Sequence, residues 1–213
     1  MIKRQLQAKI KDQLTKFPVI AITGPRQSGK TTLARALLPG YKYFNLEDIG
    51  TKALAVNDPV SFINSIEGKA IIDEIQKLPE LLSQIQVKVD ESKKTGQFVI
   101  TGSESLLLSE KISQSLAGRV VNNVLLPLSC KELRTSDNEA KSINTQILKG
   151  FYPRIYSTNI TFSEFFPEYV NTYVEKDVRS LKNIGDLSLF EKFLQLLAGR
   201  VGQPLNLTSL AND

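Results

Sequence analysis

Short apolar runs alternate with helix-period patterns along the first part of the 213-residue chain. Five runs have the length and composition of buried strands, at 19–23, 41–46, 69–73, 97–101 and 120–126. Apolar residues at helical spacing predict helices at 2–16, 30–38, 59–66, 78–94 and 109–117. Strands without internal alternation that are separated by helices are typical of a parallel sheet buried on both faces. We therefore predict an α/β sandwich with five parallel strands.

After Pro127 the pattern changes. The stretch RTSDNEAKSINT at 134–145 is polar and loop-like, and from about residue 150 apolar residues again recur at helical spacing, as in FEKFLQLLAGR at 190–200. We place the boundary near 135–150, with a first domain over 1–135 and a mostly helical region over 136–213.

The segment GPRQSGKT between the first strand and the next helix fits the pattern G-x-x-x-x-G-K-[ST] in the context that it requires. Glycines allow the backbone dihedrals at which successive amides point at a phosphate, and the helix N-terminus adds partial positive charge. In this role Lys30 reaches the β- and γ-phosphates of a nucleotide and the Thr31 hydroxyl ligates Mg²⁺. Arg26 contacts phosphate or a partner, or is a solvated loop arginine. The predicted nucleotide-binding residues are Gly24, Pro25, Arg26, Gln27, Ser28, Gly29, Lys30, Thr31 and Thr32.

The stretch KAIIDEIQ at 69–76 supplies two carboxylates at the end of a predicted strand. Asp73 would end at the same sheet edge as the loop, where it can hold Mg²⁺ together with Thr31. Glu74 follows directly and is placed to polarise a water for attack on the γ-phosphate.

Three further polar residues are catalytic candidates with open alternatives. Thr101 and Ser103, at the end of the strand QFVIT, could sense the γ-phosphate or orient the water, or belong to an ordinary strand-to-loop turn. Arg119 stands before the fifth strand, where a guanidinium could stabilise charge on the transferring phosphoryl group, within the chain or from a neighbouring subunit. A salt bridge is the alternative role for Arg119.

Composition narrows the chemistry. The chain has no histidine, which excludes histidine zinc sites, Ser-His-Asp triads and imidazole acid/base catalysis. The one cysteine, Cys130, is expected to fill a core position rather than act as a nucleophile. Residues 1–40 carry eight Lys or Arg and one Asp, a net charge of +7, whereas the rest carries 19 against 21, a net charge of −2. This basic segment suits a polyphosphate ligand, nucleic acid or simply a solvated helix face.

Taken together, the motifs resemble one family of prokaryotic AAA-type ATPases. The resemblance rests on GPRQSGKTTL, FNLED, DPVSF, IIDEIQKLPELL, VITGSESLLL, SLAGRV, PLSCKEL, GFYPRIY and YVEKDV, in that order. It implies a P-loop NTPase three-layer sandwich with the fourth strand between the two motif strands, then a small, mostly helical unit that begins a winged helix. In longer relatives a domain similar to restriction-type nucleases follows.

The resemblance also leads us to expect that the chain stops at the opening of the winged-helix unit. Thr208 is interpreted as a helix cap with too few residues after it for a stable helix. Leu205, Leu207 and Leu210 would then lack partners, so we expect a frayed or self-associating tail from about residue 203.

Two functions follow as hypotheses. The first is an ATPase that uses ATP and Mg²⁺ as a switch or motor, as a possible homo-oligomer. The second is an ATP-gated module that binds DNA or a protein client with little hydrolysis. A GTPase is disfavoured because the Asn-Lys-x-Asp stretch is missing, and a small-molecule kinase does not need Glu74. No apolar stretch approaches the roughly 20 residues that span a bilayer, so we expect no membrane partner. The N-terminus MIKRQLQAKIKDQL lacks the apolar core of a signal peptide, so we expect a cytoplasmic protein.

Overall fold

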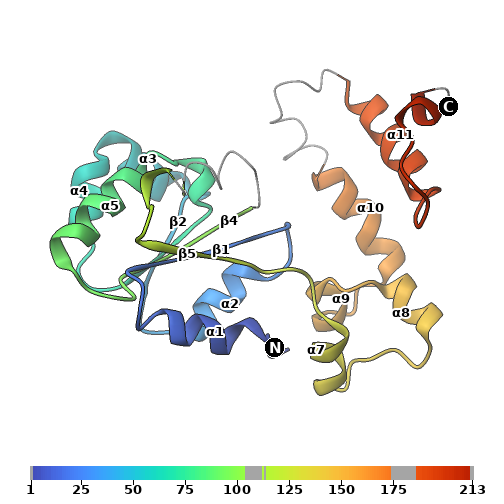
Figure 1. Ribbon diagram of the computed structural model, residues 1–213, viewed down its shortest axis with the longest axis horizontal. Coiled ribbons are helices and arrows are strands. Elements are labelled where there is room, and N and C mark those ends of the chain that lie inside the picture. Colours follow the sequence, from blue (N-terminus) through green and yellow to red (C-terminus); the bar gives the residue numbers. More distant parts are fainter. Residues whose placement is uncertain (1, 104–111, 113, 174–185, 212–213) are drawn as a thin grey trace. The chain divides into compact units, whose positions relative to one another are not determined.

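The computed structural model describes residues 2–103, 112, 114–173 and 186–211 (Figure 1). Within it the chain forms two compact units, residues 1–159 and 160–213. Much of the helix predicted at 109–117, and nearly all of the YVEKDV motif, lie outside the described residues. Each unit is described by itself below.

The first unit is built on a five-stranded parallel sheet with the order β2-β3-β4-β1-β5. Its strands are β1 (Val19–Gly24), β2 (Lys42–Asn45), β3 (Ala70–Asp73), β4 (Phe98–Ser103) and β5 (Val120–Val124). All five predicted strands are present, and β4 lies between β1 and β3 as the resemblance implied. The loops after β1 and β3 therefore open on the same edge of the sheet (Figure 1).

Helices cover both faces of this sheet because successive residues of a strand point to opposite sides. Ile20 and Ile22 of β1 pack toward α1 (Leu6–Gln13) and α2 (Lys30–Leu37). Val19 and Ala21 pack into the opposite cluster, with α3 (Ile49–Asn57), α4 (Pro59–Ser65) and α5 (Leu81–Ser92). The fold is thus the P-loop NTPase three-layer sandwich.

Helix α3 was not predicted from the sequence. It buries only Ala55, and Ile49 is 86% exposed, so its apolar residues follow no clear periodicity. A local signal was available, because the Asp48 side chain caps the helix by accepting a hydrogen bond from the Thr51 amide at 2.8 Å.

Three short helices follow β5 in the first unit: α7 (Cys130–Thr135), α8 (Ile143–Lys149) and α9 (Pro153–Ser157). Helix α7 begins with a capping box in which Ser129 and Glu132 bond each other's backbone amides. The prediction that Cys130 fills a core position is wrong: as the first residue of α7 it faces solvent.

The second unit holds α10 (Phe162–Tyr173), α11 (Leu187–Ala198) and α12 (Leu207–Ala211). Helix α11 confirms most of the helix predicted at 190–200. The expectations for the end of the chain need correction. A short helix does form there, and its cap is Asn206, whose side chain accepts from the Ser209 amide at 3.0 Å.

The three leucines near the end of the chain also differ from one another. Leu210 is buried, whereas Leu205 and Leu207 are exposed, as expected of residues without partners. Within the described residues, every helix falls short of the length and apolarity that a membrane span requires.

Candidate functional site

The loop after β1 is shaped by two glycines with positive φ, a backbone conformation in which other residues are strained. Gly24 has φ 143°, and a Cβ there would lie 2.3 Å from the carbonyl oxygen of Leu125. This close approach is fixed by a hydrogen bond of 2.7 Å from the Leu125 amide to the Thr23 carbonyl. Gly29 has φ 93° and leads into α2, and Gln27 has φ 57°, which few L-residues adopt. The strained backbone turns the loop into the helix N-terminus.

Lys30 lies across this loop. Its ammonium donates to the carbonyls of Gly24 at 2.9 Å and Pro25 at 2.8 Å, and the residue is 6% exposed. Among the described residues, Gln27 Oε1 and Ser28 Oγ are buried side-chain oxygens without a hydrogen-bond partner. Because buried polar atoms in proteins are normally bonded, two such atoms in one loop indicate a site for a polar ligand.

Asp73 ends β3 in the middle of three hydroxyl groups. It is 3% exposed, and its Oδ2 accepts from the Thr31 hydroxyl at 2.8 Å and from the Tyr43 hydroxyl at 2.7 Å. Its Oδ1 accepts from the Thr101 hydroxyl. Burial, and then the hydrogen bond to Asp73, raise the pKa of Tyr43, so its hydroxyl stays protonated as a donor. Thr31 and Asp73, the predicted metal pair, are therefore in direct contact.

Glu74 leaves the strand with φ 60°, which turns the chain into the short 3₁₀ helix Ile75–Lys77. Its carboxylate accepts from the Gln76 amide, which also donates to Ser103 Oγ at 3.0 Å. Burial raises the pKa of Glu74, while the hydrogen bond from Gln76 acts in the opposite direction. Glu74 is thus a half-buried carboxylate beside the loop, with a pKa above its ordinary value.

Two parts of the chain match known families. Residues 16–134 match the family described as an AAA domain, more than half of the chain. The chain belongs to this AAA domain family. Residues 140–213 of the AAA protein match a domain family of unknown function, DUF8612.

Relatives of this AAA protein are longer. It is 30% identical over 182 residues to uncharacterized proteins of Mycobacterium tuberculosis and Mycobacterium bovis, which covers 84% of the chain and 40% of each relative. The chain thus spans about two fifths of the length of these curated relatives.

Solved structures show the same fold. The Walker-type ATPase of Pyrococcus abyssi is similar with a TM-score of 0.51 and 15% identity, over 94% of this chain and 77% of that one. A signal transduction ATPase with a tetratricopeptide repeat sensor from Pyrococcus horikoshii is similar with a TM-score of 0.52 and 18% identity. The match covers 81% of this chain and 32% of that one.

The other residues predicted for the nucleotide site are placed in different surroundings. Arg26 is half-buried in the loop, and Thr32 is exposed on α2. The Thr101 hydroxyl donates to Asp73 and accepts from the Glu74 amide at 3.4 Å, so it already supports both acids. Ser103 contacts Gln76 rather than either acid.

Arg119 lies at the opposite edge of the sheet from the loop. Its carbonyl accepts from the amide of Val19, the first residue of β1, whereas Gly24 is the last, about 17 Å further along the strand. Its guanidinium pairs with Asp90 of α5, with Nη2 and Oδ2 2.8 Å apart. This distance and the pair with Asp90 do not support a catalytic role within its own chain. A role in a neighbouring subunit remains a prediction.

Arg4 is a functional candidate that the sequence analysis missed. Its buried guanidinium donates to the carbonyl of Ser28 in the loop at 2.7 Å and to Glu132 of α7 at 3.1 Å. Helix α1 begins after this anchored residue, at Leu6 rather than at residue 2 as predicted. Arg4, Tyr43 and Gln76 were all missed because their partners lie far away in the sequence or across a turn.

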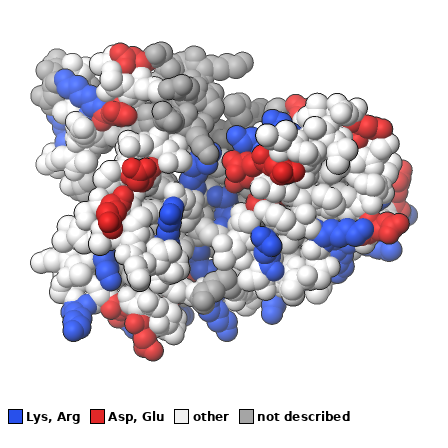
Figure 2. All heavy atoms as spheres, turned by 180° about the vertical axis from the view of Figure 1, so that it is seen from behind, with Lys and Arg blue, Asp and Glu red and all other residues white. Residues whose placement is uncertain are grey.

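The charge of +7 in residues 1–40 does not form one basic surface. Arg4 and Lys30 are buried, Lys16 pairs with Asp12 at 2.6 Å, and Arg35 stacks over an aromatic ring. Figure 2 shows basic and acidic side chains interspersed over one face of the molecule. The segment therefore gives little support to a nucleic-acid surface.

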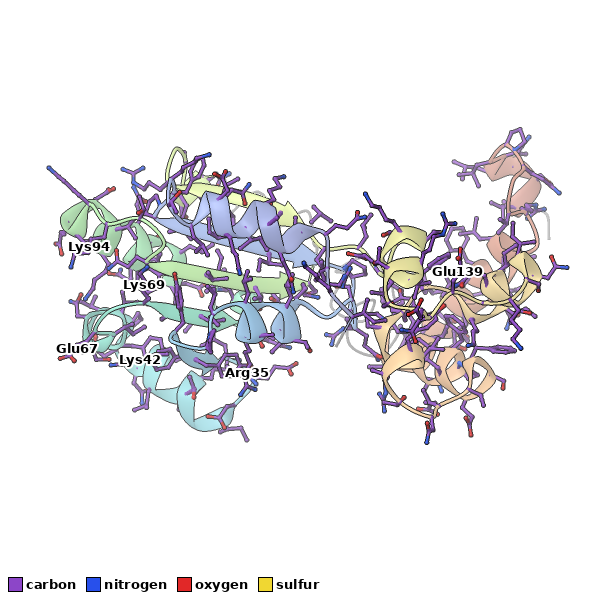
Figure 3. All side chains as sticks on the ribbon, turned by 90° about the horizontal axis from the view of Figure 1, so that it is seen from below. Arg35, Lys42, Glu67, Lys69, Lys94 and Glu139 are labelled. Carbon is purple, nitrogen blue, oxygen red and sulfur yellow. The ribbon has the colours of Figure 1, made fainter. Side chains whose placement is uncertain are left out.

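Lysines do gather at the edge where the strands begin. Figure 3 shows Lys42, Lys69 and Lys94 toward that end of the sheet, with Glu67 beside them. A cavity of about 490 Å³ there is lined by Lys69, Lys94 and Lys88 among others. Lys88 donates to the carbonyl of Asn64 near the end of α4 at 3.1 Å. Lys88 thus complements the negative end of this helix.

Proposed function

We propose that this AAA domain binds ATP with Mg²⁺ and hydrolyses it to ADP and phosphate, as a switch or motor for a client. The observation that carries the proposal is the meeting of three features at one edge of the sheet. They are the loop with Lys30 across it, the Thr31–Asp73 pair and the turned-out Glu74.

The residues present fit a magnesium ion. Thr31 and Asp73 offer a hydroxyl and a carboxylate, the oxygen ligands that Mg²⁺ prefers, either directly or through water. When bound, Mg²⁺ would neutralise charge on the phosphate oxygens and align them for in-line attack. The unpartnered oxygens of Gln27 and Ser28 support a polar ligand in the loop above this pair.

The chain's own residues then divide the work. Loop amides and the Lys30 ammonium bind the phosphates. To do so, the ammonium gives up its hydrogen bonds to the Gly24 and Pro25 carbonyls and donates to phosphate oxygens instead. Glu74 accepts the proton of the water whose oxygen forms the new bond to the γ-phosphorus, while the bond to the β-phosphate oxygen breaks. Gln76 holds the Glu74 carboxylate before this step.

Replacing Lys30 with alanine is expected to remove most of the affinity for Mg·ATP, because the loop loses its one buried ammonium. Calorimetric titration of wild-type and Lys30→Ala protein with ATP and Mg²⁺ measures the difference. The matched control is Lys52→Ala, on α3 and outside the loop, which should bind as the wild type does. Equal affinities of wild type and Lys30→Ala would sink the proposal.

We also propose that the ATPase acts on a DNA or protein client and that residues 136–213 form the opening of a winged-helix unit. The alternative function, an ATP-gated binding module, predicts ATP binding without phosphate release. Salt-dependent affinity for DNA in the absence of turnover would favour that alternative. Phosphate release by the wild type would favour the ATPase.

We further propose that Arg119 acts on the nucleotide of a neighbouring copy, since its own site is out of reach. Arg119→Ala should then lower turnover and leave ATP binding unchanged. Mixing Arg119→Ala with Glu74→Gln protein should restore part of the activity, because one shared site would contain both intact residues. Normal hydrolysis by Arg119→Ala alone would show that the pair with Asp90 is purely structural.

A further inference from the structure

Tyr43 connects the outer strand β2 to the carboxylate at the end of β3. In the sheet register Asn45 pairs with Asp73, and Tyr43 stands two residues earlier, so the side chains of Tyr43 and Asp73 lie on the same face. The phenol is long enough to bridge the offset, and its hydroxyl donates to Asp73 Oδ2 at 2.7 Å. Oδ2 is the oxygen that also accepts from Thr31.

Helix α2 holds both ends of this arrangement. Thr31 and Arg35 are four residues apart and therefore lie on one face of the helix. Thr31 contacts the carboxylate, and the guanidinium carbon of Arg35 lies 4.7 Å from the centroid of the Tyr43 ring (Figure 3 labels Arg35). A guanidinium at that distance from an aromatic face is attracted to it, which keeps the ring in place.

The buried position of Asp73 makes this contact consequential. Since the carboxylate is 3% exposed, solvent has little access to replace a lost hydrogen bond. Without the phenol, Oδ2 would keep only the Thr31 hydroxyl, and the carboxylate could rotate toward Thr101 on its other oxygen. The Thr31 hydroxyl would then lose the fixed acceptor that aims its lone pairs away from Asp73.

We propose that Tyr43 is a positioning residue for the magnesium ion, fixing the Asp73 carboxylate against Thr31 from the neighbouring strand, with Arg35 steadying its ring. The inference rests on the proposed ATP site, because the ion enters with the nucleotide. Partners that orient metal ligands typically affect metal affinity by 10- to 100-fold when removed.

The test compares nucleotide affinity with and without the metal. A fluorescent ATP analogue is titrated into full-length wild type and Tyr43→Phe, once with Mg²⁺ and once with EDTA, and the ratio of the two dissociation constants gives the gain due to the metal. We expect Tyr43→Phe to reduce this gain by about tenfold, the low end of the range for such partners, and to leave the affinity in EDTA unchanged.

Tyr41→Phe is the matched control. The Tyr41 hydroxyl donates to the Gly96 carbonyl at 2.7 Å, away from Asp73, so its removal should leave the gain at the wild-type value. Unchanged affinity in EDTA also shows that the loop of Tyr43→Phe is folded, and no separate activity measurement is needed.

Three outcomes would overturn the inference. If Mg²⁺ raises the affinity of Tyr43→Phe for nucleotide as much as it does for the wild type, the phenol is not needed for the metal. Equal losses in Mg²⁺ and in EDTA would indicate a general structural role. Wild-type protein that binds no nucleotide in either buffer would overturn the ATP site itself, and the inference with it.

Discussion

Glu74→Gln is expected to lower the rate of phosphate release by about 10²- to 10⁴-fold, the range for general-base assistance, while ATP binding stays nearly intact. The amide has the shape of the carboxylate, so it can keep a contact with Gln76. It cannot accept the proton of the attacking water, and the loop with Lys30 is left unaltered. Rapid-quench measurement of phosphate release, together with titration of a fluorescent ATP analogue, separates the two effects.

Two further variants sharpen this result. Asp73→Asn should weaken the dependence on Mg²⁺ rather than the proton transfer, because Asp73 contacts the Thr31 hydroxyl. Glu67→Gln is the matched control, since Glu67 is an exposed acid that precedes β3 at the far edge of the sheet (Figure 3). Unchanged phosphate release in Glu74→Gln would move the catalytic base elsewhere or show that the wild type does not hydrolyse ATP.

Glu132→Ala is expected to reduce the free energy of unfolding of the first unit by about 3–5 kcal/mol, the cost of leaving one charge of a buried pair uncompensated. Arg4 and Glu132 have side chains only 7% and 6% exposed. Glu132 also accepts from the amides of Gln5 at 2.7 Å and Ser129 at 2.9 Å, so three donors lose their acceptor together. Urea unfolding followed by circular dichroism measures the change.

The control for this loss is an exposed pair of the same type. Arg134 and Glu139 are 3.1 Å apart with side chains 72% and 42% exposed. Glu139→Ala should leave the free energy of unfolding close to that of the wild type, because water screens the pair. A loss for Glu132→Ala as small as that for Glu139→Ala would mean that Arg4 finds other compensation in its carbonyl partners.

The buried pair also predicts a pH dependence. Burial alone would raise the pKa of Glu132, but the bonds from Ser129, Gln5 and Arg4 outweigh it and hold the pKa below its ordinary value of 4.5. A group with a depressed folded-state pKa stabilises the protein fully above its unfolded-state pKa and loses that contribution as the pH falls through the folded-state value. The difference in stability between wild type and Glu132→Ala should therefore shrink as the pH is lowered below about 4.5.

Much of the core and of the site was determined by local sequence. Continuous apolar runs such as 19–23 and 97–101 identify buried parallel strands, since a strand covered on both faces needs no polar positions. The loop Gly24–Thr31 and the pair Asp73–Glu74 follow two of those strands, and parallel strands bring their carboxyl ends to one edge. Local pattern and topology together were enough to predict this meeting.

Tertiary structure alone decided which side chains support that site. Tyr43 reaches Asp73 across 30 residues and Arg4 reaches Glu132 across 128, and no periodicity records such pairs. It also decided that Arg119 lies at the end of the sheet opposite to its own loop and that Cys130 is exposed to solvent. The physical reason is that strand and helix patterns report only which residues are buried along one element. The partner of a buried polar group depends on where the other elements pack, and that is settled only when the whole sheet is assembled.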